Sequence, residues 1–276
     1  MPELAEVEFF RKRWHQAAIN QRVRAVKLHP AARIFRGVNT PKLKRALTGA
    51  KLLSSETRSK QMVFRFSGGA WIGVHLGMSG DLRVEDANYS PLKHDHLVLE
   101  FAACSLVFTD PRMFGRVQFH VGAAEPAWWA RIAPAILSEK FTVAAVAAFL
   151  KRRARAPIKA VLLMQERFPG VGNWMADEIL WRARIHPSQP AGSLTPAEVR
   201  TLWRESRHVC RQALDVIAGR GDYLPPDLNH HIPKTWLFRH RWQSRGRDPL
   251  TDTPLVREEI GGRTTAWSPA RQKLRK

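Results

Sequence analysis

The chain has 276 residues, 44% of them hydrophobic, which is enough for two ordinary domains with buried cores. Lys and Arg number 45 against 24 Asp and Glu, leaving a formal net charge of +21. Such a field attracts polyanions, which favours nucleic acid as the partner over a membrane surface or an inert basic surface. No hydrophobic run approaches the roughly 20 residues of a transmembrane helix, and the N-terminus lacks the pattern of a signal peptide. We therefore expect no membrane partner.

Only two cysteines occur, Cys104 and Cys210, each within a hydrophobic stretch. Two thiols cannot form a disulfide framework or a four-thiolate zinc site. We expect both to be core residues.

The first predicted element is an amphipathic helix over residues 3–18. Its hydrophobic positions recur at three- and four-residue spacing: Leu4, Val7, Phe10, Trp14 and Ala17. From residue 60 to 120 short hydrophobic segments alternate with Gly, Asp, Asn and Ser. This pattern predicts an antiparallel β-sandwich or barrel.

After Pro134 the chain becomes rich in Ala, Leu and Arg, and helices are predicted near 141–151, 157–167, 174–184 and 195–218. From Trp236 onward helix signals stop. Residues 254–267 predict a β-hairpin that turns at 258–262, with Arg263 beside the turn. The predicted domains are 1–135, 136–230 and 231–276.

The stretch PGVGNWMADEILW predicts a glycine-rich turn before a helix that begins near Asn173. Backbone N–H groups at such a turn suit a phosphate, which points to Gly172, to the Asn173 amide and to Lys159 as a point charge. The alternative is a tight helix–helix corner in which the glycines only permit close packing.

Five motifs lie in a characteristic order: PELAEVE at the N-terminus, HLGMSG at 75–80, DPRMFGR at 110–116, PGVGNWMADE at 169–178 and GGRTTAW at 261–267. In order and spacing they resemble the formamidopyrimidine-DNA glycosylase and endonuclease VIII family along nearly the whole chain. The resemblance implies an α+β multidomain fold. It comprises an N-terminal antiparallel β-sandwich with flanking helices, a helix–two-turn–helix domain and a C-terminal β-hairpin finger.

The resemblance also implies the chemistry. Proline is small enough for Met1 to be removed, and Pro2 would then present a secondary amine as nucleophile. A free α-amine has a reference pKa of about 7.7–8.0 against about 10.4 for lysine, so more of it is deprotonated at neutral pH. Glu3 is expected to shuttle a proton to the opening sugar ring, although a first-turn carboxylate also stabilises a helix.

Two further residues are expected to support this chemistry. The family's strand-start lysine, matched by Lys60, contacts the lesion and the adjacent phosphate; alone, such a residue is more often a solvated charge. Glu6 is expected to hold the neighbouring backbone and water, or else to act only as a helix carboxylate.

Base flipping leaves a vacancy in the duplex that side chains must fill. Met78, Arg112 and Phe114 match the family's void-filling trio, whereas without the resemblance Met78 and Phe114 would more often be core residues. DNA contacts are expected from His75, Lys159, Gly172, Asn173 and Arg263.

The finger departs from the zinc-binding pattern of many family members. The positions that align with the four cysteines are Asp248, Thr251, Ser268 and Arg271, so no zinc is expected. The segment resembles the zincless finger of plant and fungal members. Its fold is expected to rest on the burial of Trp236, Phe238, Trp242 and Trp267.

These observations predict a bifunctional DNA glycosylase and apurinic/apyrimidinic lyase that removes 8-oxoguanine and formamidopyrimidines from damaged duplex DNA. We expect a monomer without a cofactor, located with the bacterial nucleoid in the cytoplasm, or in the nucleus of a eukaryote. Three alternatives stay open: an endonuclease VIII-like enzyme for oxidised pyrimidines or for single-stranded or crosslinked DNA, a silent damage-binding protein, and an RNA- or ribosome-associated protein. The loop over 219–235 does not clearly match the family's lesion-capping loop.

Overall fold

The computed structural model describes residues 2–29 and 33–275. Its contacts divide the chain into two compact units. Unit 1 comprises residues 1–132 with Gly221–Leu224, and unit 2 comprises Ala133–Arg220 with Pro225–Lys276. Each unit is described by itself, and the predicted domain borders at 135 and 230 stay predictions.

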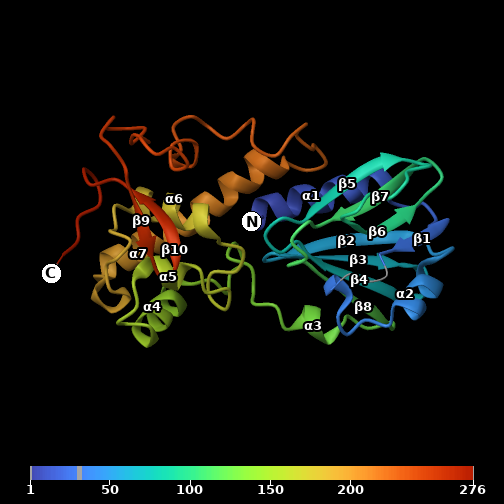
Figure 1. The fold of residues 1–276 in the computed structure, drawn as a ribbon. Coiled ribbons are helices and arrows are strands. Elements are labelled where there is room, and N and C mark those ends of the chain that lie inside the picture. The colour runs from blue at the N-terminus through green and yellow to red at the C-terminus, as the bar shows by residue number, and fades with distance from the viewer. Residues whose placement is uncertain (1, 30–32, 276) are drawn as a thin grey trace. The chain divides into compact units, whose positions relative to one another are not determined.

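Unit 1 is built from two antiparallel four-stranded sheets with helices beside them (Figure 1). One sheet has the order β1-β6-β7-β5 and the other the order β2-β3-β4-β8. The strands are β1 (Ala25–Leu28), β2 (Leu52–Arg58), β3 (Gln61–Phe66), β4 (Ala70–His75), β5 (Asp81–Asp86), β6 (Asp95–Glu100), β7 (Cys104–Thr109) and β8 (Arg116–Val121). The helices are α1 (Leu4–Ala18), α2 (Thr40–Leu47) and α3 (Ala127–Ala130), with 3-10 turns η1 (Arg33–Phe35) and η2 (Ser67–Gly69).

Two connections cross from one sheet to the other at the same end of the sandwich. Residues 76–80 join β4 to β5, and residues 110–115 join β7 to β8. His75 pairs with both Gln61 and Arg116, and Asp81 pairs with Thr109. The turn at 59–60 between β2 and β3 therefore lies at this same end.

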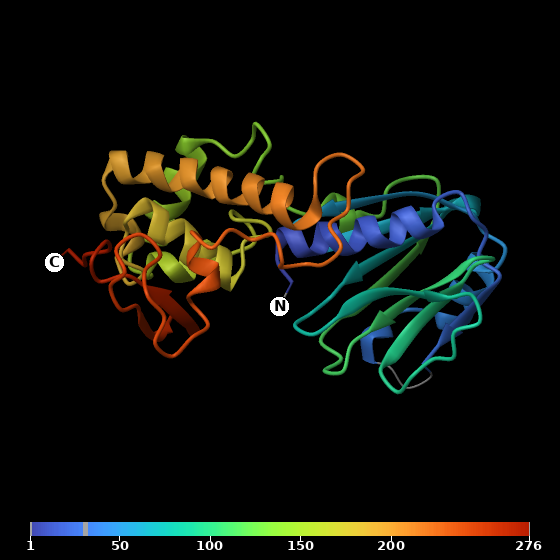
Figure 2. The ribbon, with the colours of Figure 1, turned by 90° about the horizontal axis from the view of Figure 1, so that it is seen from above.

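Helix α1 packs against β2 and β5, an outer strand of each sheet (Figure 2). Along β2 it runs antiparallel, because the Ser55 hydroxyl meets His15 Nδ1 at 2.9 Å and the Thr57 hydroxyl donates to Glu8 at 2.7 Å. One further turn back along the helix brings its first residues toward the end of β2. Figure 1 shows α1 starting at this end of the sheets.

Unit 2 is mostly helical and ends in a β-hairpin. Its elements are α4 (Val143–Arg152), α5 (Ile158–Leu162), α6 (Asn173–Ala183), η3 (Ala191–Ser193), α7 (Pro196–Ala213), a π-helical turn η4 (Leu214–Ala218), η5 (Leu237–Arg239), β9 (Val256–Ile260) and β10 (Arg263–Trp267). The hairpin turns at Gly261 and Gly262, whose φ angles of 62° and 75° match the left-handed backbone of a tight two-residue turn.

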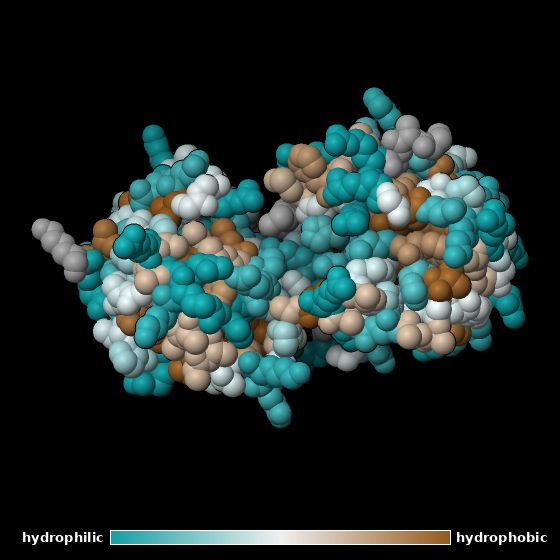
Figure 3. Space-filling model, turned by 90° about the horizontal axis from the view of Figure 1, so that it is seen from below, coloured by the Kyte–Doolittle hydropathy of each residue, from teal (hydrophilic) through white to brown (hydrophobic). Residues whose placement is uncertain are grey.

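Each unit has a hydrophobic core. Unit 1 encloses residues such as Phe64, Leu97 and Phe108 between its sheets, and unit 2 encloses Val161 and Leu180 between its helices. Hydrophilic residues cover most of the face of each unit in Figure 3. The expectation that Cys104 and Cys210 are core residues is confirmed, since both are buried. In the part of the chain that the structure describes, no helix is long and apolar enough to span a bilayer.

Candidate functional site

The first turn of α1 places two buried carboxylates directly after Pro2. Pro2 is half-buried in a non-helical segment, and Glu3 is the N-cap residue with only 2% of its surface exposed. Glu6 is 8% exposed and accepts a hydrogen bond from the Glu3 amide at 3.2 Å. Glu6 therefore holds the backbone amide of Glu3, the residue after Pro2, as part of the capping box of α1.

Lys60 and His75 lie at the same end of the sandwich. Lys60 occupies the two-residue turn between β2 and β3 and is 8% exposed, so it is not a freely solvated lysine. His75 Nδ1 accepts the Gly77 amide at 3.0 Å, which leaves Nε2 as the protonated nitrogen of the neutral ring. Burial lowers the pKa of His75, and the charge of Lys60 lowers it further.

The three residues expected to fill the void are on the surface rather than in the core. Met78 is 39% exposed and Phe114 is 52% exposed. Arg112 is also exposed, and its guanidinium carbon lies 4.8 Å from the centre of the Phe114 ring. All three stand on the two crossing connections, which are in contact: a side chain at Gly77 would meet the Phe114 backbone at 2.5 Å. The alternative that Met78 and Phe114 are core residues is wrong.

One buried residue that the sequence analysis did not single out holds both connections. Asp110 is fully buried, and its carboxylate accepts the Ser79 hydroxyl at 2.6 Å and the Gly115 amide at 2.7 Å. Asp110 opens DPRMFGR and Ser79 belongs to HLGMSG. The signal available in the sequence was an aspartate at the end of a hydrophobic strand, followed by turn residues.

In unit 2 the glycine-rich turn and the hairpin meet. Gly172 is the N-cap residue of α6, and the Asn173 side-chain amide donates to the Thr264 carbonyl of β10 at 2.8 Å. A side chain at Gly261 would lie 2.7 Å from the Ala160 side chain, so the hairpin turn packs against α5. Arg263 is exposed beside that turn. The structure thus brings three expected DNA contacts, Gly172, Asn173 and Arg263, to one region.

Lys159 has a different place from the one expected. Its side chain is fully buried, and its ammonium group pairs with Asp177 and donates to the Asn173 carbonyl at 2.7 Å. Asp177 also accepts Arg241 at 2.6 Å and the Ala266 amide of β10 at 3.0 Å. Lys159 therefore does not present its charge to solvent, and the expected phosphate contact gives way to a structural role. The hub around Asp177 ties α5, α6 and the hairpin together.

The four positions that align with the zinc cysteines also come together, around Asp248. Its carboxylate accepts the Trp181 indole at 3.0 Å and the Thr251 amide at 3.2 Å, and Arg271 Nε lies 4.0 Å away. Burial opposes the ionisation of Asp248, but hydrogen bonds, among them those of Ser268 and Trp181, outweigh it and lower its pKa. A guanidinium beside the one carboxylate does not fit a zinc site. Across residues 2–29 and 33–275, no group of three or more His, Cys, Asp or Glu side chains is arranged to hold a metal.

The aromatic packing of the finger is as expected for three of its four residues. Trp236 is 5% exposed, Phe238 is 9% exposed, and Trp267 is half-buried with its indole donating to Glu258 at 2.7 Å. The prediction for Trp242 is wrong, because it is 56% exposed. Its ring instead covers the guanidinium of Arg241, at 4.2 Å.

The sandwich with buried carboxylates at a helix start and the helical unit that ends in a hairpin make up an α+β fold of two units. Residues 1–117 match the formamidopyrimidine-DNA glycosylase N-terminal domain, and residues 132–221 match the helix–two-turn–helix domain of the same enzymes. The chain therefore belongs to the formamidopyrimidine-DNA glycosylase family, as its motifs predicted.

Similar proteins agree over the whole length. The formamidopyrimidine-DNA glycosylase of Thermus thermophilus is 36% identical, covering 99% of this chain and 98% of that one. The enzyme of the same name from Laribacter hongkongensis is 33% identical over 99% and 100%. In fold, the Lactococcus lactis enzyme bound to DNA that contains N7-benzyl-Fapy-dG has a TM-score of 0.85 at 23% identity, over 99% and 100% of the two chains. The predicted fold class is confirmed.

Proposed function

We propose that this chain is a DNA glycosylase and apurinic/apyrimidinic lyase of base excision repair, which removes oxidised bases through an amine of Pro2. The observation that carries this proposal is the first turn of α1, where Glu3 and Glu6 are buried next to Pro2 at the end of the sandwich that also holds Lys60. Buried carboxylates beside an amine suit proton transfer during covalent catalysis.

The reaction follows from these groups. In a chain that starts at Pro2, the amine nitrogen attacks C1′ of the deoxyribose, and the bond between C1′ and the base breaks. Glu3 delivers a proton to the opening sugar ring, and the departing base takes up the proton that the attacking amine releases. The resulting iminium acidifies the C2′ proton, so the 3′ phosphate leaves by β-elimination and the 5′ phosphate follows by δ-elimination. Lys60 contacts the lesion and its phosphate.

DNA is held by phosphate contacts and opened by inserted side chains. Gly172, Asn173 and Arg263 are proposed to bind phosphates, and His75 to donate from Nε2. The exposed Met78, Arg112 and Phe114 fill the vacancy left by the flipped base. The finger keeps its shape without zinc, through the Asp248 cluster and the buried aromatic residues. One chain carries every residue used, so a monomer suffices.

The test is borohydride trapping on duplexes that contain 8-oxoguanine, an oxidised pyrimidine or an abasic site. Wild type is expected to form a covalent adduct that Pro2→Gly loses, because the secondary amine is gone. Glu3→Gln is expected to slow base excision. Glu8→Gln is the matched control, since Glu8 lies one turn further along α1 and pairs with Arg11.

The trapping experiment identifies the substrate class and tests the lyase activity. The lesion with the best yield identifies the substrate class, oxidised purine or oxidised pyrimidine. If wild type formed no adduct on any duplex, the abasic one included, the lyase proposal would be refuted. The protein would then be a damage-binding protein.

A further inference from the structure

The two exposed connections of unit 1 share one internal anchor. Asp110 Oδ1 accepts from the Ser79 hydroxyl of the first connection at 2.6 Å and from the Arg112 amide of the second at 3.3 Å. Its Oδ2 accepts from the Gly115 amide at 2.7 Å. A single carboxylate thus binds both loops from beneath.

Asp110 is itself fixed by the sheet. It follows β7 directly and is completely buried. Its own amide donates to the His94 carbonyl at 3.0 Å, and its carbonyl meets His96 Nε2 at 2.9 Å. Because hydrogen bonds hold both the amide and the carbonyl of Asp110, its carboxylate has a defined position. The two loops that bind this carboxylate are therefore held in a defined position as well.

The parts of the loops that Asp110 holds are those that reach into solvent. Met78 precedes Ser79, and Phe114 precedes Gly115, so each inserted side chain is adjacent to a residue bound by the carboxylate. Met113 adopts a left-handed backbone with φ 52°, which an L-residue rarely does unless its surroundings impose it. The Met113 amide donates to the Asp110 carbonyl at 3.1 Å.

We propose that Asp110 is a positioning residue for base flipping: its carboxylate presets the loops of Met78, Arg112 and Phe114 in the arrangement that enters the duplex. The proposal rests on the proposed function. Preset loops avoid ordering costs at the moment when stacking must be broken, so the effect belongs to the opening of the duplex and not to the chemistry at C1′.

The experiment compares Asp110→Asn with wild type on two substrates. One is a duplex with 8-oxoguanine opposite cytosine, in which the base must be flipped; the other is a single strand with an abasic site, which has nothing to flip. We expect excision from the duplex to fall about tenfold or more, because a hydrogen bond to a charged group is typically worth that factor. Nicking of the single strand should stay within about twofold. Ser79→Ala, which removes one donor only, should give a smaller loss in the same direction.

A fluorescent 2-aminopurine beside the lesion supplies a second readout, because its emission rises when it is unstacked. Asp110→Asn should slow or reduce this rise without changing the trapping yield on the single strand. Asp95→Asn is the matched control, since Asp95 is also buried, at the start of β6 beside β7, but binds Arg83 and Tyr89 instead of the two loops. It should lower stability without favouring one substrate over the other.

Equal losses on both substrates would overturn the proposal and make Asp110 a residue for stability alone. Unchanged duplex excision would overturn it as well. Failure of the wild type on the single-stranded abasic site would instead count against the proposed lyase, so the two failures are distinguishable.

Discussion

Glu178 of α6 is an acid enclosed by the finger segment. It is fully buried, its Oε1 accepts Arg182 Nε at 2.8 Å, and its Oε2 accepts the Phe238 amide at 3.2 Å. Burial raises its pKa to about 7, although Arg182 and the backbone amides oppose the shift. In the folded protein this carboxyl is therefore protonated at pH values where it would be ionised in an unfolded chain.

This shift makes stability depend on pH in a defined direction. The folded pKa lies above the ordinary value of 4.5, so the contribution of Glu178 to the free energy of unfolding is largest in acid. It falls as the pH rises from about 4.5 through about 7. We would measure the free energy of unfolding with denaturant from pH 5 to 8 and subtract the value for Glu178→Gln from that of the wild type. This difference should decline up to about pH 7 and then level off.

Glu259→Gln is the control for that series. Glu259 is exposed on β9, so its variant makes the same chemical change at a carboxyl that the fold does not enclose. A Glu178 difference that is flat, or that grows with pH, would contradict the raised pKa.

At the scale of residues, the motifs predicted the local surroundings of side chains better than their contacts with residues far away in the sequence. Pro2, Glu3, Met78 and Phe114 belong to local patterns, and their local surroundings follow from neighbours in the sequence. Lys159 was misjudged because its partner, Asp177, lies 18 positions away, and only the packing of α5 on α6 brings the two together. A basic residue near a glycine turn has the same appearance in the sequence whether its charge is exposed or neutralised.

At the scale of elements, hydrogen bonds hold the finger in two places, at strand β10 of the hairpin and at the segment before β9. The Asp177 hub holds β10 through the Ala266 amide, and the Asp248 cluster holds the segment before β9 against Trp181 of α6. The positions that would carry thiolates in zinc-binding relatives thus supply hydrogen bonds and an ion pair.

Asp248→Asn should therefore loosen the finger. The variant loses its charge beside Arg271 and weakens the bonds from Trp181 and the Thr251 amide. We expect about 1–3 kcal/mol of lost stability, the usual cost of disturbing a buried hydrogen-bonded group. Calorimetry measures this as a lower Tm, and addition of zinc should not restore it.

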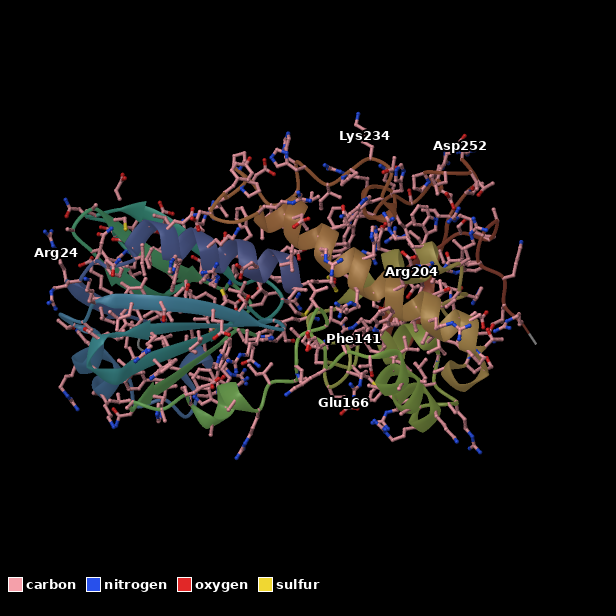
Figure 4. All side chains as sticks on the ribbon, turned by 180° about the vertical axis from the view of Figure 1, so that it is seen from behind. Arg24, Phe141, Glu166, Arg204, Lys234 and Asp252 are labelled. Carbon is pink, nitrogen blue, oxygen red and sulfur yellow. The ribbon has the colours of Figure 1, made fainter. Side chains whose placement is uncertain are left out.

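Asp252→Asn makes the same chemical change on the surface of the same segment (Figure 4). Asp252 is 83% exposed in its pair with Arg247, and exposed pairs contribute little. A Tm loss for Asp252→Asn as large as that for Asp248→Asn would mean that the Asp248 cluster has no special role.

Elements with long hydrophobic repeats were predicted well, and short ones were not. The helix expected over 157–167 ends at Leu162, because Gln165 turns its side chain back on the backbone. It donates to the Leu163 and Val171 carbonyls and accepts the Gly170 amide. Such a bond competes with the helix but leaves no trace in hydrophobic spacing. Helix α2 and strands β1 and β2 went unpredicted, since they are short and partly exposed.

At the scale of the molecule, a formal net charge of +21 makes electrostatics a large part of DNA binding, so binding is sensitive to salt. Each phosphate neutralised by the protein releases counterions, so the logarithm of affinity falls linearly with the logarithm of salt concentration. Arg263→Gln should lower affinity for all sequences and reduce that slope by about 1, because one phosphate contact is lost. Binding titrations between low and moderate salt measure the slope.

Arg24→Gln removes the same charge in unit 1, at the end of the sandwich away from the connections 76–80 and 110–115. Arg24 is exposed, and its amide bonds the Glu100 carbonyl at the end of β6 opposite to Asp95 (Figure 4). Its variant should leave the slope unchanged. If both variants changed the slope alike, the net charge and not a placed contact would govern binding.

Residues 231–276, the predicted finger, contain no sulfur atom at all: both cysteines and all six methionines lie earlier in the chain. Peroxides attack thiolates and thioethers first, and a thiolate that is oxidised no longer binds its metal. The Asp248 cluster and the Asp177 hub offer no such target. We therefore expect the finger to keep its shape under the oxidising conditions that damage DNA bases.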